Sequence, residues 1–398
     1  MKILQLAPRC PFPEDDGGKI GIANITKELA KRGAEITLVY FYTEDADANP
    51  PEYAREFAEI IPIKHDTSNS LIRLIKSVLY RKSVYVEKHI SFNVKAEIRK
   101  IISKRKFDII HCDHTAMMAL GQYCRKRLKC PLGLRLHNLE YTIWQRYADS
   151  LQNLSFEELY VRDQAKILKH YEKKVIGRAD VSFAITNVDA ELAKSMAPKG
   201  NIVIASAGVN TDDFMPDNSI ERNPFEMIHA TVYRWRHNIN AIEWFIHEVL
   251  PILAAKNTKF TLSLLGKSAP DSLRDCSPNV VLHGYVPKVQ PYLNHAGIYI
   301  APLFVGGGIR IKILEAMAME LPVVASPIAA EGITATEADG LFIANNKDEF
   351  ASHILRLSQD ENLRREAGKN AREFILKNHT WKKNVGIMFD EYTKLINK

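Results

Sequence analysis

Residues 301–325 read APLFVGGGIRIKILEAMAMELPVVA. A buried strand is expected over 297–302, just before the three glycines, and a helix with apolar residues at helical spacing is expected over 311–319. A second short strand is expected over 322–325. Strand, glycine loop, helix and strand in this order predict a βαβ unit with two parallel strands in one sheet.

The same alternation continues in both directions along the chain. Strands are expected over 2–7, 35–42, 107–112, 132–136, 181–186, 201–205, 227–232, 260–265, 280–282 and 341–344. Turn-forming residues at 207–224 interrupt the pattern and indicate a linker. We therefore expect an α/β fold of two doubly wound Rossmann-like domains facing across a cleft, over 1–207 and 208–379, with a last helix at 380–398 crossing back to the first.

Composition excludes several classes of protein. With 46% hydrophobic and 25% charged residues the chain is globular, and it contains no apolar stretch long enough for a membrane-spanning helix. The apolar run at the N-terminus is too short for a secretion signal. The five cysteines are scattered without a Cys-x-x-Cys pair, so neither a disulfide framework nor a metal site is expected. These features favour a reducing cytoplasm.

The net charge of +7 is unevenly distributed. Residues 71–106 contain eleven Lys and Arg against two acids. One interpretation is a solvated helical face, and the other is contact with an anionic surface. Because residues 71–82 mix apolar and cationic side chains, an anionic membrane surface is the partner that we expect. Nucleic acid is not expected, since no recognition motif accompanies the charge.

The glycines at 306–308 are candidates for binding a diphosphate. Backbone amides at the start of a helix hydrogen-bond anions, and the helix dipole favours negative charge there. Arg310 and Lys312 add two cations, and Glu315 lies where a carboxylate can accept hydrogen bonds from the hydroxyls of a ribose. The alternative is a glycine-rich loop beside a surface glutamate.

Three further candidates follow other predicted strands. Gly17 and Gly18 precede the first helix. Neither the Gly-x-Gly-x-x-Gly motif of dinucleotide-binding domains nor a P-loop is present, so these glycines are interpreted either as an anion site or as a plain tight turn. His137 follows the strand at 132–136, although a lone histidine is usually structural. Arg234 lies in the loop after the strand at 227–232, which either binds phosphate or is simply solvated.

These segments together resemble a known family. The run GGGIRIKILEAMAMELPVVAS resembles the signature of the retaining group 1 (family 4) glycosyltransferases, which have the GT-B fold. Weaker similarities are spread along the whole chain, at Gly17-Gly18-Lys19-Ile20, His137-Asn138-Leu139-Glu140, Ala207-Gly208-Val209-Asn210, Arg236-His237-Asn238 and Leu282-His283-Gly284-Tyr285-Val286.

The resemblance implies a retaining, metal-independent hexosyltransferase that moves a sugar from a nucleotide-diphosphate-sugar donor to a glycan or lipid-linked acceptor. It implies cell-surface polysaccharide biosynthesis in the cytoplasm or on the inner face of the membrane, with no further cofactor. The second domain would bind the donor and the first the acceptor. By position, the implied catalytic residues are His137, Arg310 and Lys312, and the implied donor-binding residues are Gly17, Gly18, Arg234, Tyr285, Val286, Gly307, Gly308, Ile309 and Glu315.

One departure from the family concerns the sugar. Many relatives carry two glutamates eight positions apart, and the earlier position here is Gly307. A carboxylate that would hold sugar hydroxyls is therefore missing. Two alternatives stay open: a nucleotide-sugar epimerase on the same fold, and a non-catalytic nucleotide-sugar-binding partner subunit.

Overall fold

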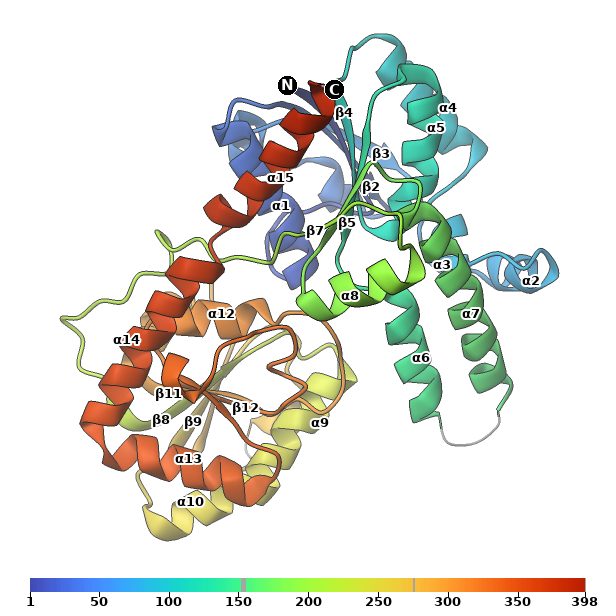
Figure 1. Cartoon of the computed structure of the whole chain (residues 1–398). Helices are drawn as coiled ribbons and strands as arrows, with labels where there is room; N and C mark the ends of the chain where they lie inside the picture. The colour runs from blue at the N-terminus through green and yellow to red at the C-terminus, as the bar shows by residue number, and fades with distance from the viewer. Residues whose placement is uncertain (152–154, 275, 398) are drawn as a thin grey trace. The chain divides into compact units, whose positions relative to one another are not determined.

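The computed structural model describes residues 1–151, 155–274 and 276–397 and divides the chain into two compact units (Figure 1). Unit 1 comprises Met1–Ser206 and Asn384–Lys398, and unit 2 comprises Ala207–Lys383. Each unit contains one parallel sheet with helices packed against it, which confirms the predicted α/β class with two doubly wound sheets. The division falls at the start of the segment that was predicted to be a linker.

The sheet of unit 1 has the strand order β3-β2-β1-β4-β5-β6-β7. The direction in which strands are added reverses between β1 and β4, and ligands of such sheets bind outside the carboxyl ends of the strands at this point. The strands are β1 (Lys2–Ala7), β2 (Glu35–Tyr42), β3 (Glu59–Lys64), β4 (Ile109–Asp113), β5 (Leu132–Leu136), β6 (Val181–Ala184) and β7 (Ile202–Ile204).

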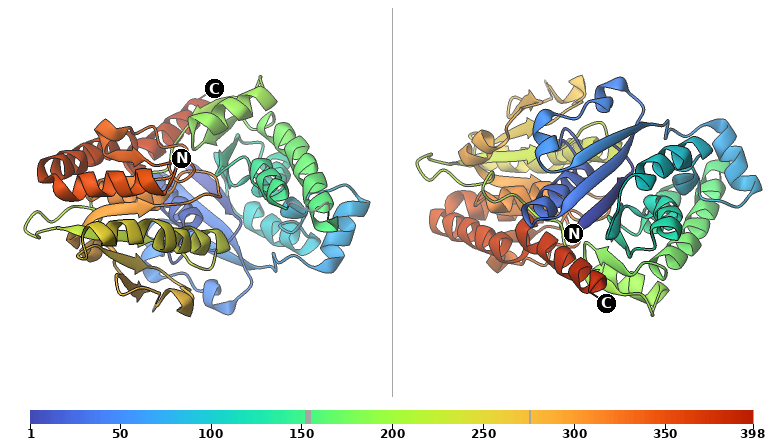
Figure 2. Two further views of the ribbon diagram at one scale, coloured as in Figure 1. Left: turned by 90° about the horizontal axis from the view of Figure 1, so that it is seen from below. Right: turned by 90° about the horizontal axis from the view of Figure 1, so that it is seen from above.

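Helices cover both faces of this sheet (Figure 2). Alternate strand residues point to opposite faces. Leu4 and Leu6 join the core formed with α4 (Phe92–Ser103), α5 (Met118–Leu128), α7 (Phe156–Ile176) and α8 (Asn187–Met196). Gln5 points the other way and accepts a hydrogen bond from Thr26 of α1 (Gly17–Lys31) at 2.9 Å. The last helix, α15 (Trp381–Ile396), also packs there, since a Cβ at Gly133 of β5 would overlap the ring of Tyr392.

The remaining helical segments of unit 1 lie in connections between strands. They are η1 (Asp45–Ala48), η2 (Glu52–Glu56), α2 (Leu71–Leu79), α3 (Val84–Glu87), η3 (Thr115–Met117) and α6 (Glu140–Ser150). Helices α6 and α7 pack side by side, and α2 lies next to α7 at the edge of the unit (Figure 1).

The sheet of unit 2 has the order β10-β9-β8-β11-β12-β13, which is the Rossmann order 3-2-1-4-5-6 when its strands are counted from β8. Its switch point lies between β8 and β11. The strands are β8 (Asn223–Ala230), β9 (Thr261–Leu265), β10 (Val280–Gly284), β11 (Ala296–Ala301), β12 (Val323–Ala325) and β13 (Leu341–Ile343).

The helices of unit 2 also pack on both sides of its sheet. One face forms a core with α9 (Arg236–Trp244), the π-helical turn Phe245–Val249, α10 (Leu250–Lys256) and α13 (Lys347–Gln359). On the other side α12 (Ile311–Ala318) packs against α14 (Glu361–Asn378). Short helical segments are η5 (Asp271–Leu273), α11 (Gln290–His295) and η6 (Glu337–Asp339). The helical region predicted over 347–377 is broken at Asp360, whose side chain caps α14.

No helix within the described residues combines the length and the apolar character needed to span a membrane.

Candidate functional site

Backbone hydrogen bonds join three strand-end loops of unit 2. The amide of Thr231 donates to the carbonyl of Leu265 at 3.0 Å, and the amide of Gly266 donates to that of Gly284 at 2.7 Å. Gly266 has φ +144°, and a Cβ there would overlap the carbonyl of Thr231. Only glycine fits this close approach without strain. The loops after β8, β9 and β10 therefore form one continuous surface at the carboxyl edge of the sheet.

Two helices begin at the switch point of unit 2 without a side-chain cap. Helix α9 begins after Trp235 and α12 begins after Arg310, and neither of these two residues caps its helix with its own side chain. Neither first turn contains an acid. Gly306 (φ +143°) and Gly308 (φ +75°) shape the loop before α12 with backbone angles that other residues rarely adopt. Both helix ends therefore retain the positive potential of uncapped amides.

Arg310 lies over the glycine loop. Its Nη1 donates to the carbonyl of Gly307 at 3.1 Å, and a Cβ at Gly306 would overlap its guanidinium. Burial, and then the positive charge of Arg310, lower the pKa of His237 in α9. His237 also stacks on Trp235, with ring centroids 6.2 Å apart. The guanidinium of Arg310 therefore lies against the backbone of the glycine loop before α12.

Lys312 and Glu315, for which separate roles were predicted, form an ion pair. Lys312 Nζ lies 2.8 Å from Glu315 Oε2 across one turn of α12. Glu315 is buried, whereas the side chain of Lys312 is about one third exposed. An ammonium group has three N–H donors, and a carboxylate accepts several hydrogen bonds. The pair therefore keeps capacity to bind a ligand through both partners.

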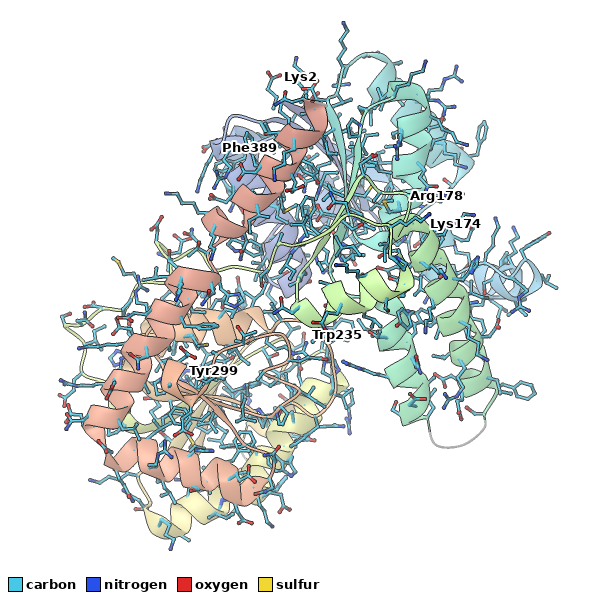
Figure 3. All side chains as sticks on the ribbon, viewed as in Figure 1. Lys2, Lys174, Arg178, Trp235, Tyr299 and Phe389 are labelled. Carbon is cyan, nitrogen blue, oxygen red and sulfur yellow. The ribbon has the colours of Figure 1, made fainter. Side chains whose placement is uncertain are left out.

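Two exposed aromatic rings lie at the same edge of unit 2. Trp235 follows β8 (Figure 3), and the ring of Tyr285 follows β10 with Lys267 Nζ 4.6 Å from its centroid. The guanidinium of Arg234 lies 5.4 Å from a ring centroid of Trp235. Tyr285 is 60% exposed and Trp235 is 52% exposed, so both rings present a face to solvent. Val286, beside Tyr285, is half-buried.

In unit 1 a buried polar cluster occupies the ends of β4 and β5. Asp113 Oδ2 accepts a hydrogen bond from Gln5 at 2.7 Å, and His111, Arg135 and His137 lie within 3.2–3.7 Å of the carboxylate. Burial opposes ionisation of Asp113, but these neighbours hold its pKa well below its ordinary value. Arg135 Nη1 contacts His137 Nε2.

His137 and its neighbour His114 are held neutral. Burial, followed by the charge of Arg135, lowers the pKa of His137 to about 3. Burial also keeps the pKa of His114 well below its ordinary value. The rings of His114 and His137 stack with centroids 3.6 Å apart. At neutral pH His137 is therefore a hydrogen-bonding group and not a cation.

A carboxylate from α7 caps the helix that follows His137. The amides of Glu140 and Tyr141, in the first turn of α6, donate to Glu172 at 3.0 and 3.2 Å, and the hydroxyl of Thr115 donates to it at 3.2 Å. Burial and then Glu140 raise the pKa of Glu172 to about 8, and burial raises that of Glu140 to about 7. Glu172 thereby ties together the loops that carry His114 and His137.

Gly17 and Gly18 begin α1, and two amides of its first turn already donate hydrogen bonds to a side chain of unit 1. The Asp16 carboxylate accepts hydrogen bonds from the amides of Gly18 and Lys19 at 3.0 and 3.1 Å. Arg9 Nη2 lies 2.5 Å from the same oxygen. The helix start that was predicted as an anion site therefore already holds an anion of the protein itself.

The structure groups the predicted residues by unit. Unit 2 brings Arg234, Tyr285, Val286, Gly307, Gly308, Ile309, Arg310, Lys312 and Glu315 to the carboxyl edge of its sheet or to the first turns of α12, whereas His137, Gly17 and Gly18 belong to unit 1. Sequence reasoning missed Arg135, Asp16 and Glu172. An arginine within the apolar strand LGLRL and an aspartate directly before a helix were signals for the first two. Within the described residues, no group of three or more His, Cys, Asp or Glu is arranged to hold a metal ion.

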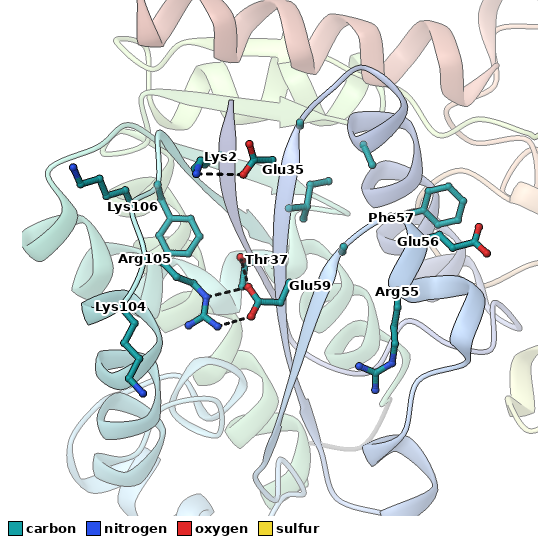
Figure 4. A pocket seen from close by; sticks show the side chains of 15 residues that line it. Lys2, Glu35, Thr37, Arg55, Glu56, Phe57, Glu59, Lys104, Arg105 and Lys106 are labelled. Atoms are coloured by element: carbon teal, nitrogen blue, oxygen red, sulfur yellow. Dashed lines mark hydrogen bonds and ion pairs between the residues drawn. The ribbon is translucent and has the colours of Figure 1, made fainter.

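A hollow of about 650 Å³ lies at the opposite, amino-terminal edge of the unit 1 sheet (Figure 4). Glu35 pairs with Lys2 at 3.3 Å, and Glu59 pairs with Arg105, whose Nε lies 3.0 Å away. Ligands of doubly wound sheets bind at the carboxyl edge. Despite its volume, this hollow is therefore not our candidate for the functional site, because it lies at the amino-terminal edge of the sheet.

The family of the chain follows from two sequence models. Residues 228–360 match the model described as Glycosyl transferases group 1, and residues 16–213 match the model described as Glycosyltransferase Family 4. The chain belongs to the group 1, family 4 glycosyltransferases. In this glycosyltransferase, the first match covers the strand-end loops of β8 to β11 and the whole of α12, and the second covers α1 and the buried cluster of unit 1.

The similarity to known proteins covers almost the whole length of this glycosyltransferase. A 44.6 kDa protein in the cps region of Klebsiella pneumoniae is 21% identical over 98% of this chain and 99% of its own. Sucrose-phosphate synthase from Thermosynechococcus elongatus has a similar structure, with a TM-score of 0.76 and 17% identity, covering 100% and 99% of the two chains. The Anabaena protein HepE in complex with UDP-glucose has a TM-score of 0.66 and 13% identity, covering 99% and 100%. These structures confirm the two-domain GT-B fold.

Proposed function

We propose that this glycosyltransferase moves a sugar from a nucleotide-diphosphate-sugar donor to a glycan or lipid-linked acceptor in cell-surface polysaccharide biosynthesis, with retention of anomeric configuration and without a metal ion. The observation that carries the proposal is the pair of uncapped helix starts, α9 and α12, at the switch point of unit 2. Arg310 and Lys312 add positive charge at the second of them.

The diphosphate is the leaving group of the proposed reaction. When the bond from the anomeric carbon to the β-phosphate oxygen breaks, both electrons stay on that oxygen and negative charge grows on the diphosphate. Fixed donors aimed at developing charge are usually the largest contribution to catalysis. In this proposal the amides of Gly307, Gly308 and Ile309, the guanidinium of Arg310 and the ammonium of Lys312 supply that stabilisation.

The Lys312–Glu315 pair is proposed to bind two parts of the donor at once. Glu315 accepts hydrogen bonds from the ribose hydroxyls, while Lys312 turns its remaining N–H donors to the diphosphate. The half-buried position of the pair supports this division, because the carboxylate lies deeper in unit 2 than the ammonium. The exposed ring of Tyr285 and the neighbouring Val286 are proposed to contact the base.

Unit 1 is proposed to bind the acceptor and to present His137 to the transferred sugar. Its low pKa keeps the imidazole neutral, so it can hydrogen-bond a sugar hydroxyl without adding a charge. Asp113 and Arg135 hold the ring in place. Asp16 already accepts hydrogen bonds from the amides of Gly18 and Lys19. We therefore propose that Gly17 and Gly18 contribute only by lacking side chains, which lets the backbone lie close to the donor.

The relatives support the class of donor and the pathway. HepE is described in complex with UDP-glucose, and the Klebsiella relative is described by its position in the cps region. A uridine nucleotide is therefore the first donor to test. Many family members have a carboxylate at the position of Gly307. We therefore propose that the donor sugar is one whose hydroxyls need no carboxylate at this point. We further propose a peripheral location on the inner face of the cell membrane, close to lipid-linked acceptors.

The proposal is tested by calorimetric titration of the whole chain with UDP, GDP and ADP, followed by incubation with the corresponding labelled nucleotide sugars and a membrane lipid extract. We expect binding of one nucleotide diphosphate and transfer or slow hydrolysis of its sugar. Binding without turnover would favour a non-catalytic partner subunit. Isomerisation of the intact nucleotide sugar, seen by NMR, would favour an epimerase. Failure to bind any of the three nucleotides would contradict the proposed donor site.

A further inference from the structure

Helix α2 turns its apolar side away from the unit to which it belongs. Ser77 is buried, and its hydroxyl lies 3.0 Å from that of Tyr160 in α7. At roughly 100° per residue, the side of the helix opposite Ser77 is entirely apolar. The side chains there are between 51% and 73% exposed, and they are Leu71, Ile72, Ile75, Val78 and Leu79. A helix on the surface of a soluble protein normally buries such a face against the core.

The attachment of α2 to unit 1 is polar and specific. The Ser70 side chain caps the helix by accepting from the amide of Arg73 at 3.3 Å, and the guanidinium of Arg73 donates to the carbonyls of Ser68 and Asp66. Beyond the helix, the side chain of Gln164 in α7 accepts from the amide of Val84 at 2.9 Å. These contacts fix the rotation of α2, so its apolar side is held outward by the fold.

Cations surround this apolar face. Lys76 lies at its border. Arg81 and Lys82 follow the C-terminal end of the helix, where Arg81 lies 3.5 Å from Asp163 and Lys82 lies 3.2 Å from Glu87. Residues 71–106 as a whole contain eleven Lys and Arg against two acids, so the segment that carries the apolar face has an excess of positive charge.

We propose that α2 is an in-plane anchor that inserts its apolar face into the headgroup region of an anionic lipid bilayer. Amphipathic helices of this kind bury the apolar side roughly 5–10 Å into the boundary between headgroups and acyl chains, while basic residues contact lipid phosphates. Tyr80, which is 68% exposed, stands at the end of the helix, where an amphipathic ring suits the membrane interface.

Charge favours lipid over a second copy of the chain as the occupant of this face. Two copies meeting through α2 would bring two segments of the same net positive charge together, which is unfavourable. An anionic headgroup layer offers both an apolar interior and negative charge at its rim. The inference rests on the proposed location at a membrane and assigns it to one helix, but its physical basis in α2 is independent of the sugar-transfer chemistry.

The test is flotation with vesicles of phosphatidylcholine containing 30% phosphatidylglycerol, about 30% being enough to give a negative surface potential. The parent chain is compared with the triple variant Ile72→Glu, Ile75→Glu and Leu79→Glu. Because these side chains are exposed, the variant should fold, and its affinity for UDP and its melting temperature should match those of the parent. The matched control is Leu376→Glu, which changes an apolar residue of α14 that is also exposed (46%).

We expect the parent and Leu376→Glu to float with anionic vesicles, and the triple variant to lose at least tenfold in vesicle affinity. Binding of the parent should weaken with added salt and with vesicles of phosphatidylcholine alone. Equal flotation of the triple variant, or no flotation of the parent, would overturn the proposal. So would a parent dimer in solution that the triple variant converts to a monomer. Because UDP binding is measured on the same samples, failure of the anchor is distinguishable from failure of the donor site.

Discussion

The sheets of both units contain the strand order 3-2-1-4-5-6, but the helices α1 of unit 1 and α9 and α12 of unit 2 differ in how their N-termini are capped. In unit 1, the start of α1 is capped by Asp16 and the start of α6 by Glu172 from a distant helix. In unit 2, the starts of α9 and α12, which meet at the switch point, have no side-chain cap and no acid in the first turn. The glycine-led helix of unit 1, α1, thus receives a carboxylate from the residue before it, whereas Trp235 and Arg310, which precede α9 and α12, supply none.

The difference shows that a glycine-led helix start is not in itself an anion site. What decides is whether the protein supplies its own carboxylate to the first-turn amides. Asp16 does so for α1, whereas Arg310 occupies the equivalent position before α12 and adds a positive charge instead. The following predictions test this contrast.

The largest effect is expected from Arg310→Ala. Removing one preorganised donor from developing negative charge costs about 10²–10³-fold in rate. We expect a loss of that size in kcat for sugar transfer, measured with labelled donor under saturating conditions. The matched control is Arg365→Ala, an exposed arginine of α14 that pairs with Glu361. Unchanged kcat in Arg310→Ala would remove the catalytic role that we assign to α12.

Glu315→Gln should weaken donor binding more than it slows transfer. Hydrogen bonds to a charged group contribute about 1.5–3 kcal/mol, so loss of the carboxylate should raise the dissociation constant of the donor about 10–100-fold. Lys312 would also lose its ion-pair partner. Calorimetry with the nucleotide diphosphate and with its deoxyribose analogue separates the two effects. Equal weakening of both ligands would contradict contact between Glu315 and the ribose.

Glu172→Gln should change how the stability of unit 1 depends on pH. Because burial raises the pKa of Glu172 from 4.5 to about 8, the stability that it contributes is fully present below pH 4.5 and is lost progressively as the pH rises from there through 8. The parent melting temperature should therefore fall relative to that of the variant between pH 6 and pH 9. Scanning calorimetry measures both. A difference that stays constant over this range would show that Glu172 does not titrate there.

The smallest effect is expected from Asp16→Ala. Loss of an N-cap costs about 1 kcal/mol, which lowers the melting temperature of a domain of this size by roughly 2–4 °C. Affinity for the nucleotide diphosphate should stay within about twofold of the parent value, because α1 is not assigned to the diphosphate. Asp16→Asn, which retains a capping oxygen, should recover most of the stability. A large loss of donor affinity in both variants would argue that α1 binds the donor directly.

The sheet architecture and the strand-end positions of the candidate residues were predictable from sequence. Apolar runs separated by amphipathic stretches indicated parallel strands, and the glycines after 301 and His137 after 136 were expected at carboxyl ends. The proximity of Lys312 and Glu315 follows from their spacing of three, which makes side chains neighbours on a helix. The capping role of Asp16 was also readable, since aspartate directly before a helix is a preferred N-cap.

Long-range contacts set the limit of prediction. Glu172 caps a helix that starts 32 residues earlier, and the hydroxyl of Tyr392 lies 2.5 Å from Nδ1 of His111, 281 residues away. No local pattern encodes such pairs. The mixture of apolar and cationic residues at 71–82 predicted contact with a membrane surface, but the periodicity of α2 does not say which of its sides faces the protein. Only the buried position of Ser77 reveals which side faces the protein.

The most direct test of the central claim is calorimetric titration of the nucleotide diphosphate that the parent binds best into Arg310→Asp, with Asp16→Ala in parallel. The aspartate supplies to α12 the kind of cap that α1 already has, so the melting temperature should be equal to or above that of the parent. We predict no measurable nucleotide binding by folded Arg310→Asp and near-parent binding by Asp16→Ala. Parent-like binding by Arg310→Asp would contradict the assignment of the uncapped start of α12 to the diphosphate.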